Sequence, residues 1–432
     1  MTKVTRMRLG WGVVTLAFGA AGWACSGAPD APIPSEAATP THEASPSAAP
    51  DAGIDDAGGA PHDASGRGDA SAARDAGIPA SHPQVVRATG SVVASPKVLA
   101  MTFKDDPLQA QIDSFTAKMA TSGYWSQTTS EYGVGPLVAR PAYHSDKVGL
   151  LSGSDSAVET WLRDLLTSNA VGAPDPSTLY AVYLTRANTG SALSSASCGA
   201  YTGYHSELAV AGTRIGYAVI PRCDVPGESA IDTLTTLASK QHVHWATNPF
   251  PKTAPAYADV DSAHAIWKRL YGAEVGDMCL HPYVAPAKPA GLGFAAQRTW
   301  SNQAAAAGHH PCVPSAEVFF AAAPVLPESL PIPGSLYDTR GVRVAVGASK
   351  TIPVVVHADG AMGPVDLQVL DVGLHYHDRA EFTYALGKTS AMPGETVQLT
   401  ITGFAPATKG KGFVVVAKSG ARSWAFPAAA EN

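Results

Sequence analysis

A change of composition near residue 88 divides the 432-residue chain into a part that lacks the side chains of a core and a part that has them. Residues 26–88 are rich in Ala, Pro, Asp, Gly and Ser, and they hold few aromatic or large aliphatic side chains. Such a segment cannot bury enough apolar surface to offset the entropy that it would lose on ordering. We therefore expect residues 26–88 to form a disordered tether and residues 89–432 to fold.

The first 25 residues have the pattern of an export signal. Three basic residues precede an apolar run, residues 9–21, which is shorter than the roughly 20 residues that a membrane-spanning helix needs. Ala24 before Cys25 resembles a bacterial lipobox, in which the cysteine is lipidated, although Trp23 departs from the usual small or aliphatic residue. Lipidation at Cys25 is therefore predicted, and an ordinary secretory signal or an uncleaved short anchor are the alternatives.

Composition and charge narrow the classes of partner. The chain carries 30 basic and 36 acidic residues, for a net charge of -6, which gives no reason to expect a nucleic acid. No later stretch is apolar and long enough to span a membrane. We expect the outer membrane or surface of a bacterial cell as the location, through a lipid anchor only, or else secretion. The expected partner is a cell-surface ligand or protein of unknown identity.

Four cysteines remain after Cys25, and export to an oxidising compartment favours disulfides between them. Four cysteines allow three pairings, of which we expect the sequence-local one, Cys198–Cys223 and Cys279–Cys312. None of the four has C-x-x-C spacing, so a structural zinc site built from cysteine is not expected.

Residues 89–334 have the pattern of an α/β or α+β domain. Short apolar runs predict strands, and apolar residues at helical spacing predict helices. The expected order is a strand at 96–103, a helix from Pro107 with Asp106 as its N-cap, a helix at 155–168, strands at 179–184 and 215–220, and a helix that begins near Ser229 or Asp232. From 248 to 333 the chain is expected to be rich in loops.

Residues 335–432 have the pattern of an all-β domain. About seven short runs of alternating or continuous apolar residues are separated by turn residues. Val397, Leu399 and Ile401 alternate with polar residues, as in a strand with one buried face. A domain of this size with about seven strands indicates a β-sandwich of immunoglobulin-like type.

The helix that ends in "LASKQHVHWATNP" (237–249) has the spacing of a zinc-binding helix with changed residues. A zinc helix places two ligands four residues apart on one face and a carboxylate base beside the first ligand. Here Lys240 stands at the first ligand position, Gln241 at the base and His244 at the second ligand. A lysine repels a cation and a glutamine cannot act as a base, so the alternative is a plain amphipathic helix with an outer polar face.

Several segments in the same order resemble the EXORDIUM-like, or phosphate-induced, family and related bacterial exported proteins. Family members carry a helix of the type "SHELAEAATNP", which "ASKQHVHWATNP" (238–249) matches in frame. Further segments that match in order are "SGYWSQTTSEYGVG" (122–135), "SCGAYTGYHSE" (197–207), "YAVIPRC" (217–223), "AEVGDMC" (273–279) and "QRTWSN" (297–302).

This resemblance implies a zincin-like domain whose H-E-x-x-E motif is degenerate. By position, it places ligands at Lys240 and His244, the base at Gln241, and a third ligand at Glu274 or Asp277. Two of these positions have lost the required group, so a pseudo-enzyme that acts in binding or scaffolding at the cell surface is expected, with no cofactor. The alternative is an active zinc hydrolase with a rearranged ligand set, in which His205 joins His244 and Glu274 or Asp277.

The remaining histidines suggest weaker sites. His205 is expected to be a surface or hydrogen-bonded residue, with contact to the same pocket as the alternative. His309 and His310 are expected in a solvated turn. His375 and His377 stand two apart on an expected strand, which allows chelation but is equally typical of an exposed sheet face. No motif of a serine hydrolase, a phosphate-binding loop or a zinc ribbon is present.

Overall fold

The computed structural model describes residues 82–150, 155–185, 203–225, 227–280, 286–332, 338–373, 380–404 and 411–432. The predicted signal, the lipidation site Cys25 and the histidines His375 and His377 lie outside these described residues. The predicted tether ends too late, because β1 (Val85–Arg87) pairs with β8 (Tyr257–Val260). None of the helices in the described part combines the length and the apolar character needed to cross a bilayer.

A six-stranded sheet forms the centre of the first domain. Its order is β3-β2-β5-β7-β6, with β4 beside β2. The strands are β2 (Lys97–Thr102), β3 (Val138–Ala139), β4 (Tyr143–His144), β5 (Thr178–Tyr183), β6 (Tyr204–Val210) and β7 (Thr213–Ile220). β2, β5 and β7 run parallel, and their nearly continuous apolar residues are buried because helices cover both faces. β6 is an antiparallel edge strand.

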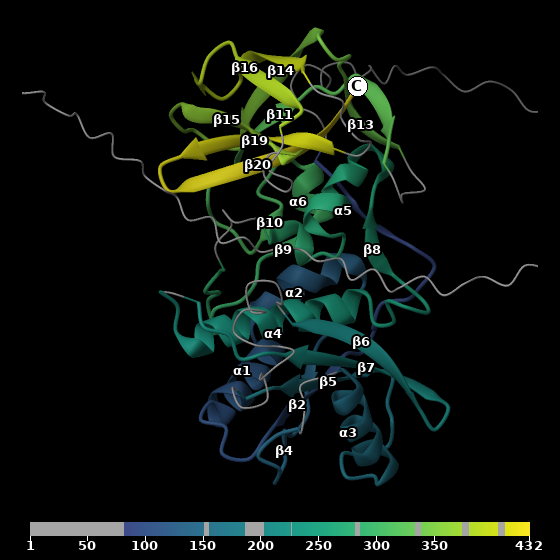
Figure 1. Ribbon diagram of the computed structural model, residues 1–432. Coiled ribbons are helices and arrows are strands. Elements are labelled where there is room, and N and C mark those ends of the chain that lie inside the picture. The colour runs from purple at the N-terminus through teal and green to yellow at the C-terminus, as the bar shows by residue number, and fades with distance from the viewer. Residues whose placement is uncertain are drawn as a thin grey trace, which may run out of the picture. The chain divides into compact units, whose positions relative to one another are not determined.

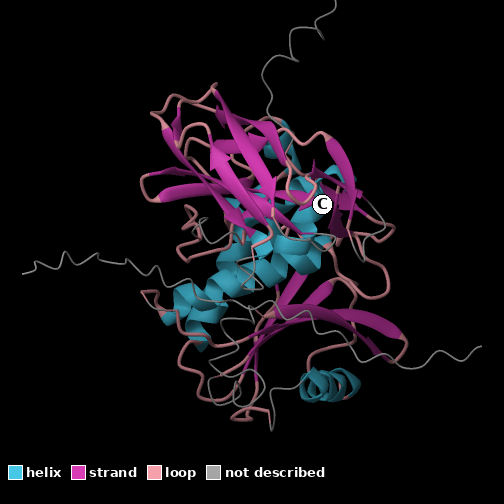
Figure 2. Cartoon of the chain, turned by 45° about the horizontal axis from the view of Figure 1, so that its top comes forward, coloured by secondary structure: helices cyan, strands magenta, loops and turns pink. Residues whose placement is uncertain are grey.

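Two helices pack on one face of this sheet and one helix on the other (Figures 1 and 2). α1 (Gln109–Thr121) and α4 (Ala230–Thr247) share the first face, and α2 (Gly123–Thr129) packs on α4. α3 (Asp155–Thr167) covers the opposite face with Val158, Trp161 and Leu162. The predicted N-cap of α1 was wrong, since the helix begins at Gln109. Asp106 instead receives a hydrogen bond from the Leu108 amide and forms a buried ion pair with Arg222 at 2.8 Å.

α4 is buried on nearly all sides, so the alternative of a plain amphipathic helix with a solvated polar face was wrong. Every residue from 238 to 247 is buried, His242 completely. The reason is that α4 lies between the sheet on one side and α2, Gly276 and Gln297 on the other. Ser229 caps its first turn by accepting the Asp232 amide. Gly216 of β7 lets the helix approach closely, since a Cβ there would lie 2.1 Å from the Trp245 indole nitrogen.

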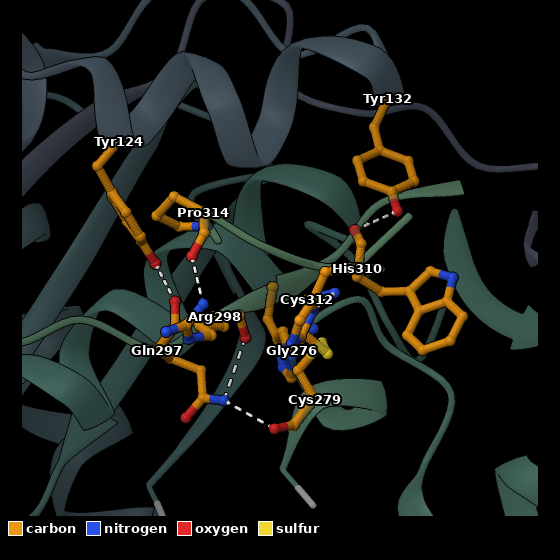
Figure 3. The surroundings of a disulfide bond; sticks show 11 residues. Tyr124, Tyr132, Gly276, Cys279, Gln297, Arg298, His310, Cys312 and Pro314 are labelled. Carbon is orange, nitrogen blue, oxygen red and sulfur yellow. Dashed lines mark hydrogen bonds between the residues drawn. A yellow bond between two sulfur atoms is a disulfide. The ribbon is translucent and has the colours of Figure 1, made fainter. Parts of the chain in front are cut away.

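The expected loop region after α4 contains short elements. In addition to β8, they are η2 (Ser262–His264), α5 (Ala265–Tyr271), η3 (Asp277–Cys279), β9 (Thr299–Trp300), α6 (Asn302–Ala306) and β10 (Cys312–Val313). A further short helix, η1 (Ser130–Tyr132), lies earlier in the chain, between α2 and β3. Cys279 and Cys312 form a disulfide, as the sequence-local pairing predicts (Figure 3). Cys223 is also disulfide-bonded, but its predicted partner Cys198 lies outside the described residues.

Two sheets enclose the core of the second domain. One has the order β11-β14-β18-β16 and the other β12-β13-β20-β19-β15-β17. The strands are β11 (Phe320–Pro324), β12 (Glu328–Pro331), β13 (Asp338–Arg343), β14 (Ser349–Ala358), β15 (Val365–Asp371), β16 (Phe382–Leu386), β17 (Ser390–Ala391), β18 (Thr396–Gly403), β19 (Lys411–Ser419) and β20 (Arg422–Glu431). The predicted boundary at residue 335 was too late, because β11 and β12 already pair in these sheets.

A continuous apolar cluster joins the two domains. It runs from Trp267 and Trp300 to Phe319, Trp424 and Phe426. Trp267 and Phe426 meet edge to face, with 5.3 Å between their ring centroids. This junction is a packed core, so the two domains share part of their hydrophobic stabilisation.

His82 packs in this junction against the rings of Phe319 and Phe426. Burial lowers the pKa of His82 from 6.5 to about 3, helped by repulsion from neighbouring histidines. The folded chain therefore keeps His82 neutral, whereas the unfolded chain takes up a proton below about pH 6.5. Stability conferred by the neutral ring is present above pH 6.5, and about 1.4 kcal/mol of it is lost per pH unit on acidification toward pH 3.

We therefore expect His82→Phe to flatten the pH dependence of folding. Between pH 7 and pH 5 the wild-type chain should lose about 2 kcal/mol more free energy of unfolding than the variant. Denaturant titrations of both chains at the two pH values measure this difference. Equal losses in the two chains would show that the buried ring does not control acid stability.

Candidate functional site

The last turns of α4 place Lys240 and His244 one turn apart on the same face of the helix. Their side chains are 6% and 2% exposed. Gln241, at the position of the base in the family motif, is 2% exposed. The sequence correctly predicts the shared face of Lys240 and His244.

Two other elements bring the remaining predicted residues to this face. The antiparallel pairing of β6 with β7 carries His205 beside the end of α4. The segment between α5 and η3 supplies Glu274, and η3 supplies Asp277. Potential ligand atoms of His205, His244 and Glu274 all lie within 4.8 Å of one another. The structure thus brings together all four of the residues proposed as a rearranged ligand set, although Asp277 stands beside the closest three.

His205, His244, Asn248 and Glu274 form a cluster of hydrogen bonds, which we call the histidine–carboxylate cluster. His244 Nδ1 lies 2.9 Å from one carboxylate oxygen of Glu274. His205 Nε2 lies 3.4 Å from the other oxygen and 3.0 Å from the carbonyl oxygen of Asn248. The Asn248 side-chain amide donates to Glu274 at 2.7 Å. Both oxygens of Glu274 are therefore engaged.

Burial and the facing groups set the charges in the cluster. Burial acts to raise the pKa of Glu274, but the imidazoles of His205 and His244 and the hydrogen bonds from His244 and Asn248 outweigh it, so the pKa of Glu274 falls below its usual value. Burial lowers the pKa of His205, although Glu274 partly opposes this effect. At neutral pH, Glu274 is therefore a carboxylate and His205 a neutral imidazole.

The hydrogen bonds also fix which ring nitrogens carry hydrogen. The Gly276 amide donates to His244 Nε2 at 3.0 Å, so in neutral His244 the hydrogen is on Nδ1, which faces Glu274. His205 Nε2 faces a carbonyl and a carboxylate oxygen, which are both acceptors, so it also carries a hydrogen. A metal ligand must offer a lone pair. In this arrangement the two nitrogens that face Glu274 offer hydrogens, so a zinc ion between them would require both rings to change tautomer.

A buried ion pair lies beside the cluster, between Lys240 Nζ and Asp277 Oδ1 at 2.8 Å. Asp277 is 14% exposed, so the pair is largely removed from water. The same Asp277 oxygen lies 4.0 Å from His244 Nε2. An ammonium group therefore supplies the positive charge at the helix position that holds a metal ligand in the family motif.

Sequence reasoning missed two members of this site. Asn248 lies in the segment 238–249 and had no predicted role, yet it joins His205 to Glu274, and its side-chain oxygen accepts a hydrogen bond from the Ala256 amide at 2.8 Å. Gly276 was not singled out, but a Cβ there would lie 2.4 Å from His244 Nε2. An isolated "VGD" gives no signal of this close approach, which arises only from tertiary packing.

The histidines expected in a solvated turn differ from each other. His309 is exposed and lies 3.2 Å from Asp359. His310 is half-buried against Phe319 and Trp424, so the prediction of a solvated turn was wrong for His310. His357 Nε2 lies 3.0 Å from the carbonyl oxygen of Gly308.

A Thr–His–Asp arrangement occurs at the edge of the first sheet. His144 lies 2.8 Å from the Thr102 hydroxyl through Nδ1 and 3.2 Å from Asp113 through Nε2. Thr102 is completely buried, however, so a substrate cannot reach its hydroxyl. These contacts fasten β4 to β2 and α1, and they do not form a nucleophilic site.

Comparisons with known proteins identify no family for this chain. No protein-family model matches the sequence, and no curated protein matches it. Among solved structures, domains 1–6 of the surface-layer protein SbsC match with 21% identity over 25% of this chain and 13% of that chain, at a TM-score of 0.16. That TM-score is too low to indicate a shared fold, so no argument rests on the match. The resemblance to the EXORDIUM-like family therefore stays a prediction.

Proposed function

We propose that this protein is an exported cell-envelope lipoprotein whose first domain is a zincin-like pseudo-enzyme, and that it acts by binding or scaffolding at the cell surface. The observation that carries the proposal is the Lys240–Asp277 ion pair, with its ammonium at the first ligand position. A bound zinc at this position would face a fixed positive charge, which repels it. Gln241 adds no carboxylate that could activate water.

The histidine–carboxylate cluster has a structural role in this proposal. It ties α4 and β6 to the segment 274–279, whose last residue, Cys279, is cross-linked to β10. Its buried polar groups satisfy each other, which is what a buried network requires in the absence of a ligand. The second candidate function, an active zinc hydrolase, draws support from the closeness of His205, His244 and Glu274.

A peptidase assay separates the two functions. The purified full chain, supplied with one equivalent of zinc, should cleave denatured casein no faster than the His244→Ala variant does. Loss of a general base alone lowers rates by a factor on the order of 10²–10⁴, so residual activity should be undetectable. Cleavage that a chelator stops, and that His244→Ala abolishes, would establish the hydrolase instead.

Lipid anchoring is tested separately in cells. We expect the wild-type chain to fractionate with membranes and the Cys25→Ser chain to be soluble or secreted, because the lipid is the proposed attachment. Cell fractionation with detection of an epitope tag measures the distribution. A Cys25→Ser chain that stays with the membranes would contradict the lipid anchor.

A further inference from the structure

A cavity of about 260 Å³ lies at the junction of the two domains, outside the histidine–carboxylate cluster. Its lining comes from residues 298 and 310 of the first domain, from residues 317–320 before and in β11, and from residues 421–424 before and in β20. Two arginines, Arg298 and Arg422, share this lining with the aromatic residues Phe319 and Trp424. We call it the two-arginine pocket. Junctions between domains are frequent places for ligand sites.

The two guanidinium groups converge on one carboxylate. Arg298 Nη2 lies 3.2 Å from one oxygen of Glu317, and Arg422 Nη1 lies 3.9 Å from the other. Glu317 is 47% exposed, so this ion pair contributes little net stability and the glutamate can turn outward at small cost. Two positive charges against one negative charge leave the pocket with an excess of positive charge.

Both arginines are held in place by contacts other than Glu317. Arg298 donates to the carbonyl oxygen of Pro314 at 2.7 Å, as Figure 3 shows beside the disulfide. Arg422 donates to the carbonyl oxygen of Val318 at 2.9 Å, and its guanidinium lies 5.3 Å from the centroid of the Phe320 ring. A guanidinium fixed in this way loses little further freedom when it binds an anion.

His310 and the aromatic residues Phe319 and Trp424 complete the lining. The Cys312 amide donates to His310 Nδ1 at 3.1 Å, so in neutral His310 the hydrogen is on Nε2. Burial and the charge of Arg298 lower the pKa of His310 to about 4, which keeps the ring neutral at pH 7. The indole nitrogen of Trp424 has no hydrogen-bond partner among the described residues. Trp424 and Phe319 pack edge to face, with 4.9 Å between their ring centroids, and their 4% and 2% exposed side chains form an apolar floor of the pocket.

We propose that the two-arginine pocket binds a ligand that joins a carboxylate to a planar apolar body. The carboxylate takes the place of the Glu317 side chain between Arg298 and Arg422, and the apolar body lies against Trp424 and Phe319. A free aromatic acid and the C-terminus of a protein chain both present this chemistry. The inference rests on the proposed binding function, since it names the ligand class of that function.

Isothermal titration calorimetry on the full chain tests the proposal with N-acetyl-L-phenylalanine as the probe. We expect saturable binding that is at least tenfold weaker for N-acetyl-L-phenylalaninamide, which lacks the charge. Arg422→Gln and Arg298→Gln should each weaken binding at least tenfold. Glu317→Gln should tighten it, because the competing carboxylate is gone. The matched control is Arg340→Gln, an exposed arginine on β13, which should leave the affinity unchanged.

A blocked tetrapeptide that ends in phenylalanine distinguishes the two sources of ligand. If the tetrapeptide binds as tightly as N-acetyl-L-phenylalanine, or more tightly, the ligand is a chain end. If only N-acetyl-L-phenylalanine binds, the ligand is a small molecule. Absent binding, equal binding of the amide, or unchanged affinity in Glu317→Gln and Arg422→Gln would overturn the proposal. The calorimetry measures binding at the two-arginine pocket only. The casein assay therefore tests the pseudo-enzyme proposal independently of it.

Discussion

Replacing Lys240 by Met should lower the free energy of unfolding of the full chain by about 3–5 kcal/mol, because it leaves the Asp277 carboxylate without its buried partner. The two side chains are 6% and 14% exposed and meet at 2.8 Å. Water cannot replace the ammonium at so buried a site without rearrangement. Denaturant titration followed by tryptophan fluorescence measures the loss.

Lys288 provides the matched control for this prediction. It pairs with Asp232 at 3.0 Å, but its side chain is 71% exposed. Lys288→Met should therefore cost about 0–1 kcal/mol. Asp277→Asn in the Lys240→Met chain should recover part of the loss, because it removes the unpaired charge. If Lys240→Met costs no more than Lys288→Met, the buried pair does not stabilise the domain.

Removing the Cys279–Cys312 disulfide by a double change to Ala should cost about 3–4 kcal/mol. The two cysteines are 33 residues apart, and the chain-entropy argument gives this loss for a loop of that length. The double change to Ser should give a similar loss, since the cross-link and not the side-chain polarity is responsible. Unfolding titrations of both variants measure it, and a loss below about 1 kcal/mol would contradict the prediction.

The disulfide and the ion pair should also depend on each other. Cys279 ends the η3 turn that begins at Asp277. Without the cross-link this turn has more freedom, so Asp277 can move toward water when its partner is removed. We therefore expect Lys240→Met to cost less in the disulfide-free chain than in the wild-type chain. Equal costs would show that the two features act independently.

The strands and helices of the first sheet were largely predictable because their residues carry a local pattern. The runs around Val98, Leu179 and Ile215 are short and apolar, which is typical of buried parallel strands, and each one is a strand in the structure. β6 was missed, since "YHSELAV" mixes polar and apolar residues. It is an edge strand, and its place is set by pairing with β7, which no local pattern shows.

The burial of α4 could not be predicted from its own residues. Lys240, Gln241, His242 and His244 give the expectation of a solvated face, because such side chains are rarely buried without partners. Their partners, such as Glu274, Asp277 and the Gly276 amide, lie more than 25 residues later in the chain. Only the resemblance to the EXORDIUM-like family predicted that Glu274 and Asp277 lie near this helix. The hydrogen bonds that make the ring nitrogens donors could be seen only in the structure.

The zinc content of the purified full chain tests the central claim most directly, namely that a lysine-centred ion pair and a self-satisfied cluster replace a metal site. After dialysis against micromolar zinc, elemental analysis should give the same zinc content for the wild-type and His244→Ala chains. The difference in zinc content between the two chains is the quantity to measure, because zinc bound elsewhere contributes equally to both. One equivalent of zinc in the wild-type chain that is lost in His244→Ala would contradict the account.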